Sequence, residues 1–185
     1  MADLLASGSQ RRPRPGLRVA VATVLVLAVL GVLADRWQRG REVDALVARA
    51  AAGHEAVRYA DGRVRAAQQY AAPALGGAGV PAGVRASLEE VVRGAAGGRV
   101  ADLREQRAAT AGVAVLPWHG QQRTARQAYV GYLDLRTEYL AGIAADLDVL
   151  YRPHPELLAA LERARSAYLH AAGARGGGVL VLPVS

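Results

Sequence analysis

The sequence predicts an all-α protein in which an N-terminal transmembrane (signal-anchor) helix precedes a small antiparallel bundle of three to four helices. Sixteen successive residues, 19–34, carry no charge, and apolar residues then recur at helical spacings from about residue 35 to residue 172. Composition agrees: 52% of the residues are apolar, and Ala, Val and Leu supply nearly all of them. A chain of 185 residues therefore has room for one anchor and one helical domain.

The uncharged segment is long enough to cross a bilayer when its flanks are included. Sixteen residues of helix reach only about 24 Å, which is short of a hydrocarbon core of roughly 30 Å. Counting from Leu17 to Trp37 restores the span, because Arg18 can extend its guanidinium to the headgroups and Trp37 lies where an interfacial aromatic is expected. The sequence thus predicts a transmembrane helix at 19–37, with the lipid bilayer as its partner.

Basic residues on the two sides of this helix indicate its orientation. Arginines precede it at Arg11, Arg12, Arg14 and Arg18, and follow it at Arg36, Arg39 and Arg41. This small excess favours residues 1–18 as a short basic cytoplasmic tail and places the main domain outside the cytoplasm. The alternative is a signal peptide that is cleaved after Ala34, which would release a secreted helical protein.

Four helical stretches are predicted in the extracytoplasmic bundle, residues 38–172. The apolar spacing places them at about 35–72, 82–111, 121–150 and 156–172. Pro73 should end the first stretch and Gly173 the last. Three glycines in the second stretch predict a kink or break, or else the close approach of a neighbouring helix: Gly94, Gly97 and Gly98.

The third stretch has the clearest periodicity. Its apolar positions repeat at alternating spacings of four and three, which is a heptad-like seam with Arg136 in the one polar slot. The seam residues are Tyr129, Leu133, Leu140, Ile143, Leu147 and Leu150. Beyond the helices, Gly112–Pro117 and Gly178–Pro183 share the pattern Gly-Val-x-Val-Leu-Pro, which fits paired strands, an old duplication or a coincidence. Residues 173–185 form a Gly-rich tail with an apolar end.

Charge and composition indicate the source of the chain more than they indicate a ligand. The net charge is +7, and all 23 basic residues are Arg, with no Lys and no Asn. Because the codons of Lys and Asn are A-rich, this bias favours a bacterium with a high-GC genome. After residue 35 the arginines are interspersed with acids, so we expect no nucleic-acid partner.

Motifs that carry chemistry are not found in the sequence. There is no Cys, and the four histidines lie far apart, at His54, His119, His154 and His170. No Glu-x-x-His pair, Gly-x-Ser-x-Gly or phosphate-binding glycine loop occurs. The sequence therefore predicts a protein that is not an enzyme, with no metal and no cofactor.

Four residues are candidates for contacts with a partner or ligand. Trp118 and His119 follow Pro117 in a predicted loop, where the Trp could bind a partner or pack as a lid on the end of the bundle. Tyr132 and Tyr139 widen the apolar face of the third stretch. We expect an interaction or scaffold protein of the bacterial cell envelope that binds another protein. The alternative is an extracytoplasmic domain that senses a small molecule.

Overall fold

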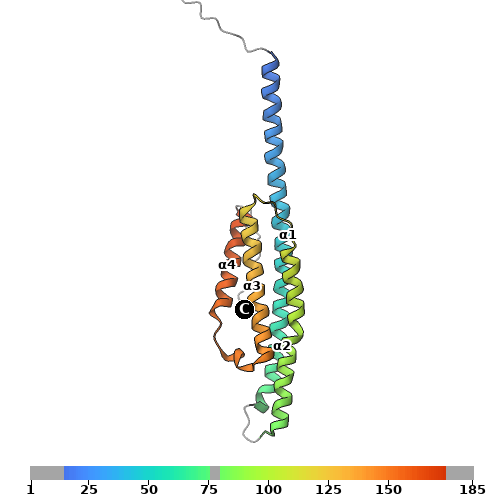
Figure 1. Cartoon of the computed structure of the whole chain (residues 1–185), viewed down its shortest axis with the longest axis vertical. Coiled ribbons are helices and arrows are strands. Elements are labelled where there is room, and N and C mark those ends of the chain that lie inside the picture. Colours follow the sequence, from blue (N-terminus) through green and yellow to red (C-terminus); the bar gives the residue numbers. More distant parts are fainter. Residues whose placement is uncertain (1–14, 76–79, 174–185) are drawn as a thin grey trace, which may run out of the picture. The chain divides into compact units, whose positions relative to one another are not determined.

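The computed structural model describes the backbone of residues 15–75 and 80–173, with the side chains of residues 19–73 in the first range. This described part is all-helical and contains no strand. It consists of α1 (Pro15–Leu75), α2 (Ala82–Ala111), α3 (Gly120–Ala145), the short 3-10 helix η1 (Leu147–Tyr151) and α4 (Pro155–Ala172) (Figure 1). The chain divides into two compact units, Met1–Gln38 and Arg39–Ser185. The all-α prediction is confirmed.

In the first unit, the described residues belong to α1 and form no core. The most apolar 18-residue window of α1 has a mean hydropathy of 2.1, and none of it is buried. Thr23 is the one hydroxyl among residues 19–34, and its Oγ1 donates to the carbonyl of Val19 at 3.0 Å, so it needs no partner outside the helix. Of the described helices, α1 alone is long and apolar enough to cross a membrane.

The second unit is built around α3, which packs against both α2 and α4. Its core is rich in alanine, which allows helices to approach closely, and three tyrosines supply the bulk: Tyr129, Tyr132 and Tyr168. Two of these phenols donate to backbone carbonyls of α1, Tyr129 to Ala50 at 2.9 Å and Tyr168 to Leu46 at 3.2 Å. Burial raises the pKa of both phenols, so they remain protonated donors at neutral pH.

Gly53 allows the closest of these contacts. A Cβ atom built at Gly53 would lie 2.6 Å from the hydroxyl of Tyr129, which is far inside van der Waals contact. Elsewhere on α1, the buried side chains recur every three to four residues or at twice that interval: Leu46, Ala50, Val57, Ala60, Val64, Ala67 and Ala71. One face of α1 therefore belongs to the core of the second unit.

Helix α2 has the bounds that the sequence predicts and is continuous through its glycines. The predicted break is therefore wrong, and the other interpretation, close approach of a neighbour, holds at one position. A Cβ at Gly97 would lie 3.4 Å from the Cβ of Ala144 in α3, whereas Gly94 and Gly98 have nothing within 4 Å. Packing against α3 offsets the low helix propensity of these glycines.

Helix α3 ends earlier than the sequence predicts. The expected helix runs to residue 150, but Asp146 is extended and its carboxylate accepts a hydrogen bond from the backbone N–H of Asp148 at 3.0 Å, which starts η1. A short acidic side chain competes in this way with the helical backbone bonds. As a consequence Leu147 and Leu150 lie in η1 and are half-buried, while the other four seam positions are fully buried.

The remaining boundaries differ little from expectation. Helix α1 continues two residues past Pro73, which lies in its last turn. Helix α4 ends at Ala172, and the predicted stop residue Gly173 caps it with a φ of +58° that L side chains rarely adopt. Gly112–Pro117 lies between α2 and α3 without strand structure, and its predicted counterpart, Gly178–Pro183, lies outside the described residues.

Candidate functional site

The four predicted contact residues fall in two separate places. Trp118 and His119 lie in the connection between α2 and α3, where His119 is the residue that precedes the first turn of α3. Tyr132 and Tyr139 lie further along α3, so that Tyr132 is about 20 Å of helix away from His119. Each place contains a cluster of polar side chains, and the two clusters differ in how these side chains are partnered.

The first cluster is a buried pair of Glu42 and His119, which are 3% and 1% exposed. Oε2 of Glu42 lies 2.6 Å from Nδ1 of His119, and Oε1 accepts the backbone N–H of Leu116 at 3.0 Å. The backbone N–H of His119 in turn donates to the carbonyl of Leu116 at 3.0 Å. One carboxylate on α1 thus holds both ends of the turn that leads into α3. A solute has no access to this pair, which indicates a structural role.

Trp118 lies beside this pair and is itself largely exposed. Its ring stands edge-on to the His119 ring, with 6.0 Å between the centroids, but the residue is 66% exposed. Most of the Trp118 side chain is therefore exposed, and both interpretations of it, as a partner contact and as a lid on the bundle, stay predictions. His119 is the member of this loop that the fold buries.

The second cluster lines a cavity of about 260 Å³ between α1, α3, η1 and α4, which we call the His54 cavity. Its polar lining comes mostly from one face of α1 and consists of His54, Arg58, Asp61, Arg65 and Gln68, with Arg136, Tyr132 and Tyr139 of α3. Its apolar lining consists of Val57, Val64, Leu140, Ile143, Leu150, Leu157, Leu158 and Leu161. Tyr132 and Tyr139, the two candidate contact residues that the sequence predicts in α3, both line this cavity.

Hydrogen bonding in the His54 cavity is incomplete. A guanidinium Nη2 of Arg136 forms an ion pair with Asp61, but the Nε of Arg136 is buried without a partner. Both ring nitrogens of His54 are also buried, with no hydrogen-bond partner among the described residues. Burial and the nearby Arg58 lower the pKa of His54, so its imidazole is neutral at pH 7.

An aromatic wall fixes the position of Arg136. Its guanidinium lies over the ring of Tyr139, 5.1 Å from the centroid, and Tyr139 packs edge-on against His154 at 4.7 Å. Burial raises the pKa of both Tyr132 and Tyr139, although Arg136 opposes this shift. His154 also hydrogen-bonds the carbonyl of Val149 through Nε2 at 3.0 Å, which holds η1 beside the cavity.

Among the described residues, the imidazole of His54 has no hydrogen-bond partner, and Asp61, the one acid in the lining of the cavity, is paired with Arg136. Within the described residues, no group of three or more His, Asp or Glu side chains could hold a metal ion. The sequence shows Arg136 as the polar slot of the seam, but its contacts on α1 come from the tertiary packing.

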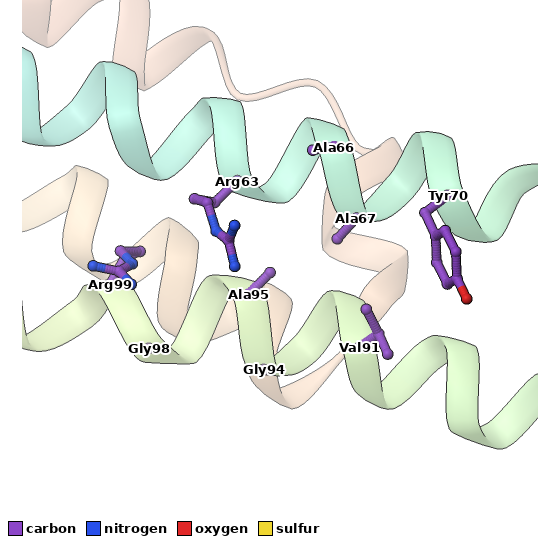
Figure 2. A pocket seen from close by; sticks show the side chains of 9 residues that line it. All are labelled: Arg63, Ala66, Ala67, Tyr70, Val91, Gly94, Ala95, Gly98 and Arg99. Atoms are coloured by element: carbon purple, nitrogen blue, oxygen red, sulfur yellow. The ribbon is translucent and has the colours of Figure 1, made fainter.

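A second hollow lies on the surface between α1 and α2, and we call it the α1–α2 groove (Figure 2). Small residues form most of its lining, namely Ala66, Ala67, Gly94, Ala95 and Gly98, with Arg63 and Arg99 toward one end. At the other end lie Tyr70 and Val91, which are 71% and 46% exposed. The groove measures about 300 Å³ and presents an aromatic side chain beside bare backbone.

No protein-family model, no curated protein and no solved structure matches this chain. Similarity therefore supplies no function for this chain, and the geometry of its sites is what indicates one. Two features of that geometry bear on function. They are the unburied apolar part of α1 and two of the hollows of the second unit, the His54 cavity and the α1–α2 groove.

Proposed function

We propose that this chain is a single-pass membrane-anchored interaction or scaffold protein of the bacterial cell envelope, with no catalytic role. Residues 19–37 cross the membrane, residues 1–18 are cytoplasmic, and residues 38–172 form an antiparallel helical bundle on the outer side. The observation that carries the proposal is the window of mean hydropathy 2.1, none of which is buried by the residues that the structure describes. Exposing such a surface to water is unfavourable, and a bilayer removes that cost.

The contacts of the second unit support the bundle. Helix α3 packs against α2 before it and α4 after it, and the connections, residues 112–119 and 146–154, are short. Short connections between packed helices favour antiparallel neighbours. Two phenols of this unit also fasten α3 and α4 to α1, through Ala50 and Leu46.

The α1–α2 groove is the surface that we assign to the protein partner. Tyr70 and Val91 are large, exposed side chains next to glycine backbone, and tyrosine is among the residues that contribute most to interfaces. Arg63 and Arg99 at the other end can form hydrogen bonds at the rim of the interface (Figure 2).

Alkaline carbonate extraction of cell membranes tests the anchor. We expect the full-length chain to stay in the pellet, and a Leu25→Arg/Val29→Arg variant to be released, since each central charge costs about 2.5–3.5 kcal/mol on insertion. The same charges at exposed positions of the second unit, Ala48→Arg/Ala101→Arg, serve as the matched control and should stay in the pellet. Intact mass distinguishes the alternatives, because a product that begins at Asp35 would show cleavage.

Photo-crosslinking in native membranes tests the partner surface. A benzophenone amino acid at Tyr70 should give one adduct of defined mass. At Tyr151, which is 77% exposed but lies on η1 away from the groove, the same probe should give none. Recovery of only free monomer from both positions would refute the interaction role.

A further inference from the structure

Two residues that line the His54 cavity carry three nitrogen atoms that are buried without hydrogen-bond partners in the described chain. They are Nδ1 and Nε2 of His54 and Nε of Arg136. Folded proteins satisfy most buried polar groups, so three unpartnered nitrogens in two lining residues need an explanation. A bound molecule with hydrogen-bonding atoms would supply one.

The charges around the cavity favour an anion. Three arginines line it against a single acid, and Asp61 is already paired with Arg136. Arg58 and Arg65 form no ion pair within the described residues. Both are exposed at the mouth of the cavity, where their positive charges can meet an incoming anion. An anion is therefore attracted to this cavity, whereas a cation is repelled.

The opposite wall favours an apolar body. Leucines and one isoleucine from α3, η1 and α4 form it, namely Leu140, Ile143, Leu150, Leu157, Leu158 and Leu161. The volume, about 260 Å³, lies just below the usual range of ligand pockets, roughly 300–1,000 Å³. This volume suits a small molecule and is too small for a nucleotide or a whole lipid.

We propose that the His54 cavity binds a small carboxylate with an apolar aliphatic or aromatic body. The carboxylate meets Arg58, Arg65 and the free Nε–H of Arg136, since guanidinium groups match the planar carboxylate fork. The neutral imidazole of His54 donates one further hydrogen bond, and the apolar body lies along the leucine wall. This inference goes beyond the interaction role and does not depend on it. Such a site would give the domain the sensing role that the sequence leaves as an alternative.

The test is a titration of the full-length chain in lipid nanodiscs, with empty nanodiscs as the blank. We expect saturable binding of hexanoate or phenylacetate by calorimetry, and their relative affinities distinguish an aliphatic from an aromatic body. Uncharged 1-hexanol should bind at least tenfold more weakly, because it lacks the charge-assisted hydrogen bonds. Inorganic phosphate should show no saturable binding in the same titration. Equal binding of hexanol and hexanoate, saturable binding of phosphate alone, or no saturable binding would each overturn the proposal.

Variants then locate the site. Arg58→Gln/Arg65→Gln removes two exposed arginines of the cavity that have no ion pair in the described chain. It should weaken carboxylate binding at least tenfold while the thermal unfolding at neutral pH stays unchanged. The control is Arg104→Gln, which removes an exposed arginine of α2 that does not line the cavity. Equal weakening by the control would refute the assignment. Membrane retention and the Tyr70 adduct should be the same in all these variants, so a failure here is separate from a failure of the interaction role.

Discussion

Two polar clusters on the same helix have opposite character. His54 follows Glu42 by twelve residues in α1, and both side chains meet residues of distant elements. The carboxylate of Glu42 has a hydrogen-bond partner for each oxygen and belongs to a pair that is almost fully buried. The imidazole of His54 has a partner for neither nitrogen and lies at a cavity.

The contrast separates polar groups that hold the fold from those that are available to a ligand. A buried group whose partners are all present stabilises the native state, and its removal leaves those partners unsatisfied. A buried polar group without partners lowers the stability of the native state. A protein can retain such a group where binding or another function benefits from it. The Glu42–His119 pair should therefore be sensitive to substitution, whereas the His54 cavity should tolerate it.

The largest expected effect tests the Glu42–His119 pair, the cluster whose carboxylate has all its hydrogen-bond partners. Glu42→Leu removes the carboxylate that Nδ1 of His119 and the N–H of Leu116 both contact, so we expect the free energy of unfolding to fall by about 3–5 kcal/mol. Chemical denaturation of the full-length chain in detergent, followed by circular dichroism, measures this. Glu55→Leu is the matched control on α1, because Glu55 is exposed and should change stability by less than about 0.5 kcal/mol. A loss below about 1 kcal/mol from Glu42→Leu would contradict a structural role for the pair.

The next effect concerns the packing between the two clusters. Gly53→Ala places a Cβ 2.6 Å from the Tyr129 hydroxyl, and we expect a loss of about 1–3 kcal/mol from overpacking. Gly62→Ala is the control, since it lies in the same helix with nothing within 4 Å and should gain about 0.5–1 kcal/mol. In the double variant Gly53→Ala/Tyr129→Phe, the loss should be partly recovered, because the nearest clashing atom is gone. Equal effects of the two alanine substitutions would show that the Tyr129 contact is loose.

Local patterns predicted the elements better than the contacts between them. The bounds of α2 match the prediction, and α4 begins one residue early, because Pro81, Pro155 and Gly173 mark helix ends in the sequence itself. The end of α3 was missed, since it depends on a hydrogen bond from Asp148 to Asp146 that apolar spacing does not reveal.

The candidate site was predicted only in part, for the same reason. Tyr132 and Tyr139 were selected from the width of the α3 face, and they do line the His54 cavity. Arg136 was recognised as a polar residue in an apolar seam. Its partner Asp61 lies 75 residues away in the chain, and only tertiary packing brings the two together.

A smaller effect tests the cluster whose hydrogen bonding is incomplete, that of His54. We expect His54→Leu to raise the free energy of unfolding by about 1 kcal/mol, because it removes two buried nitrogens that have no partner. The same denaturation measurement applies, and the variant should weaken hexanoate binding in the nanodisc titration at the same time. A stability loss above about 1 kcal/mol would mean that the imidazole contributes to the fold in the way that Glu42 does.

The smallest effect is the pH dependence that distinguishes His54 from the other imidazole near the cavity. Burial and Arg58 lower the pKa of His54 below 6.5, so the unfolded chain binds the proton more readily than the native state does. The contribution of His54 to the free energy of unfolding is therefore complete above pH 6.5 and decreases as the pH falls through the native pKa. The pKa of His154 is raised, most by its hydrogen bond to Val149 and next by its hydrogen bond to Glu156. The contribution of His154 to the free energy of unfolding is therefore complete below pH 6.5 and is lost as the pH rises through the native pKa.

Thermal unfolding between pH 8 and pH 5 separates these opposite dependences. His54→Leu should remove part of the decrease in melting temperature below pH 6.5, while His154→Gln should leave that decrease and change the profile above pH 6.5. Arg58→Gln should make the decrease of the wild type smaller, because Arg58 is the nearby cation that disfavours the charged imidazole. If His54→Leu left the acid side of the profile unchanged, the native imidazole would be as easily protonated as in the unfolded chain, and the contrast with the satisfied Glu42 carboxylate would no longer hold.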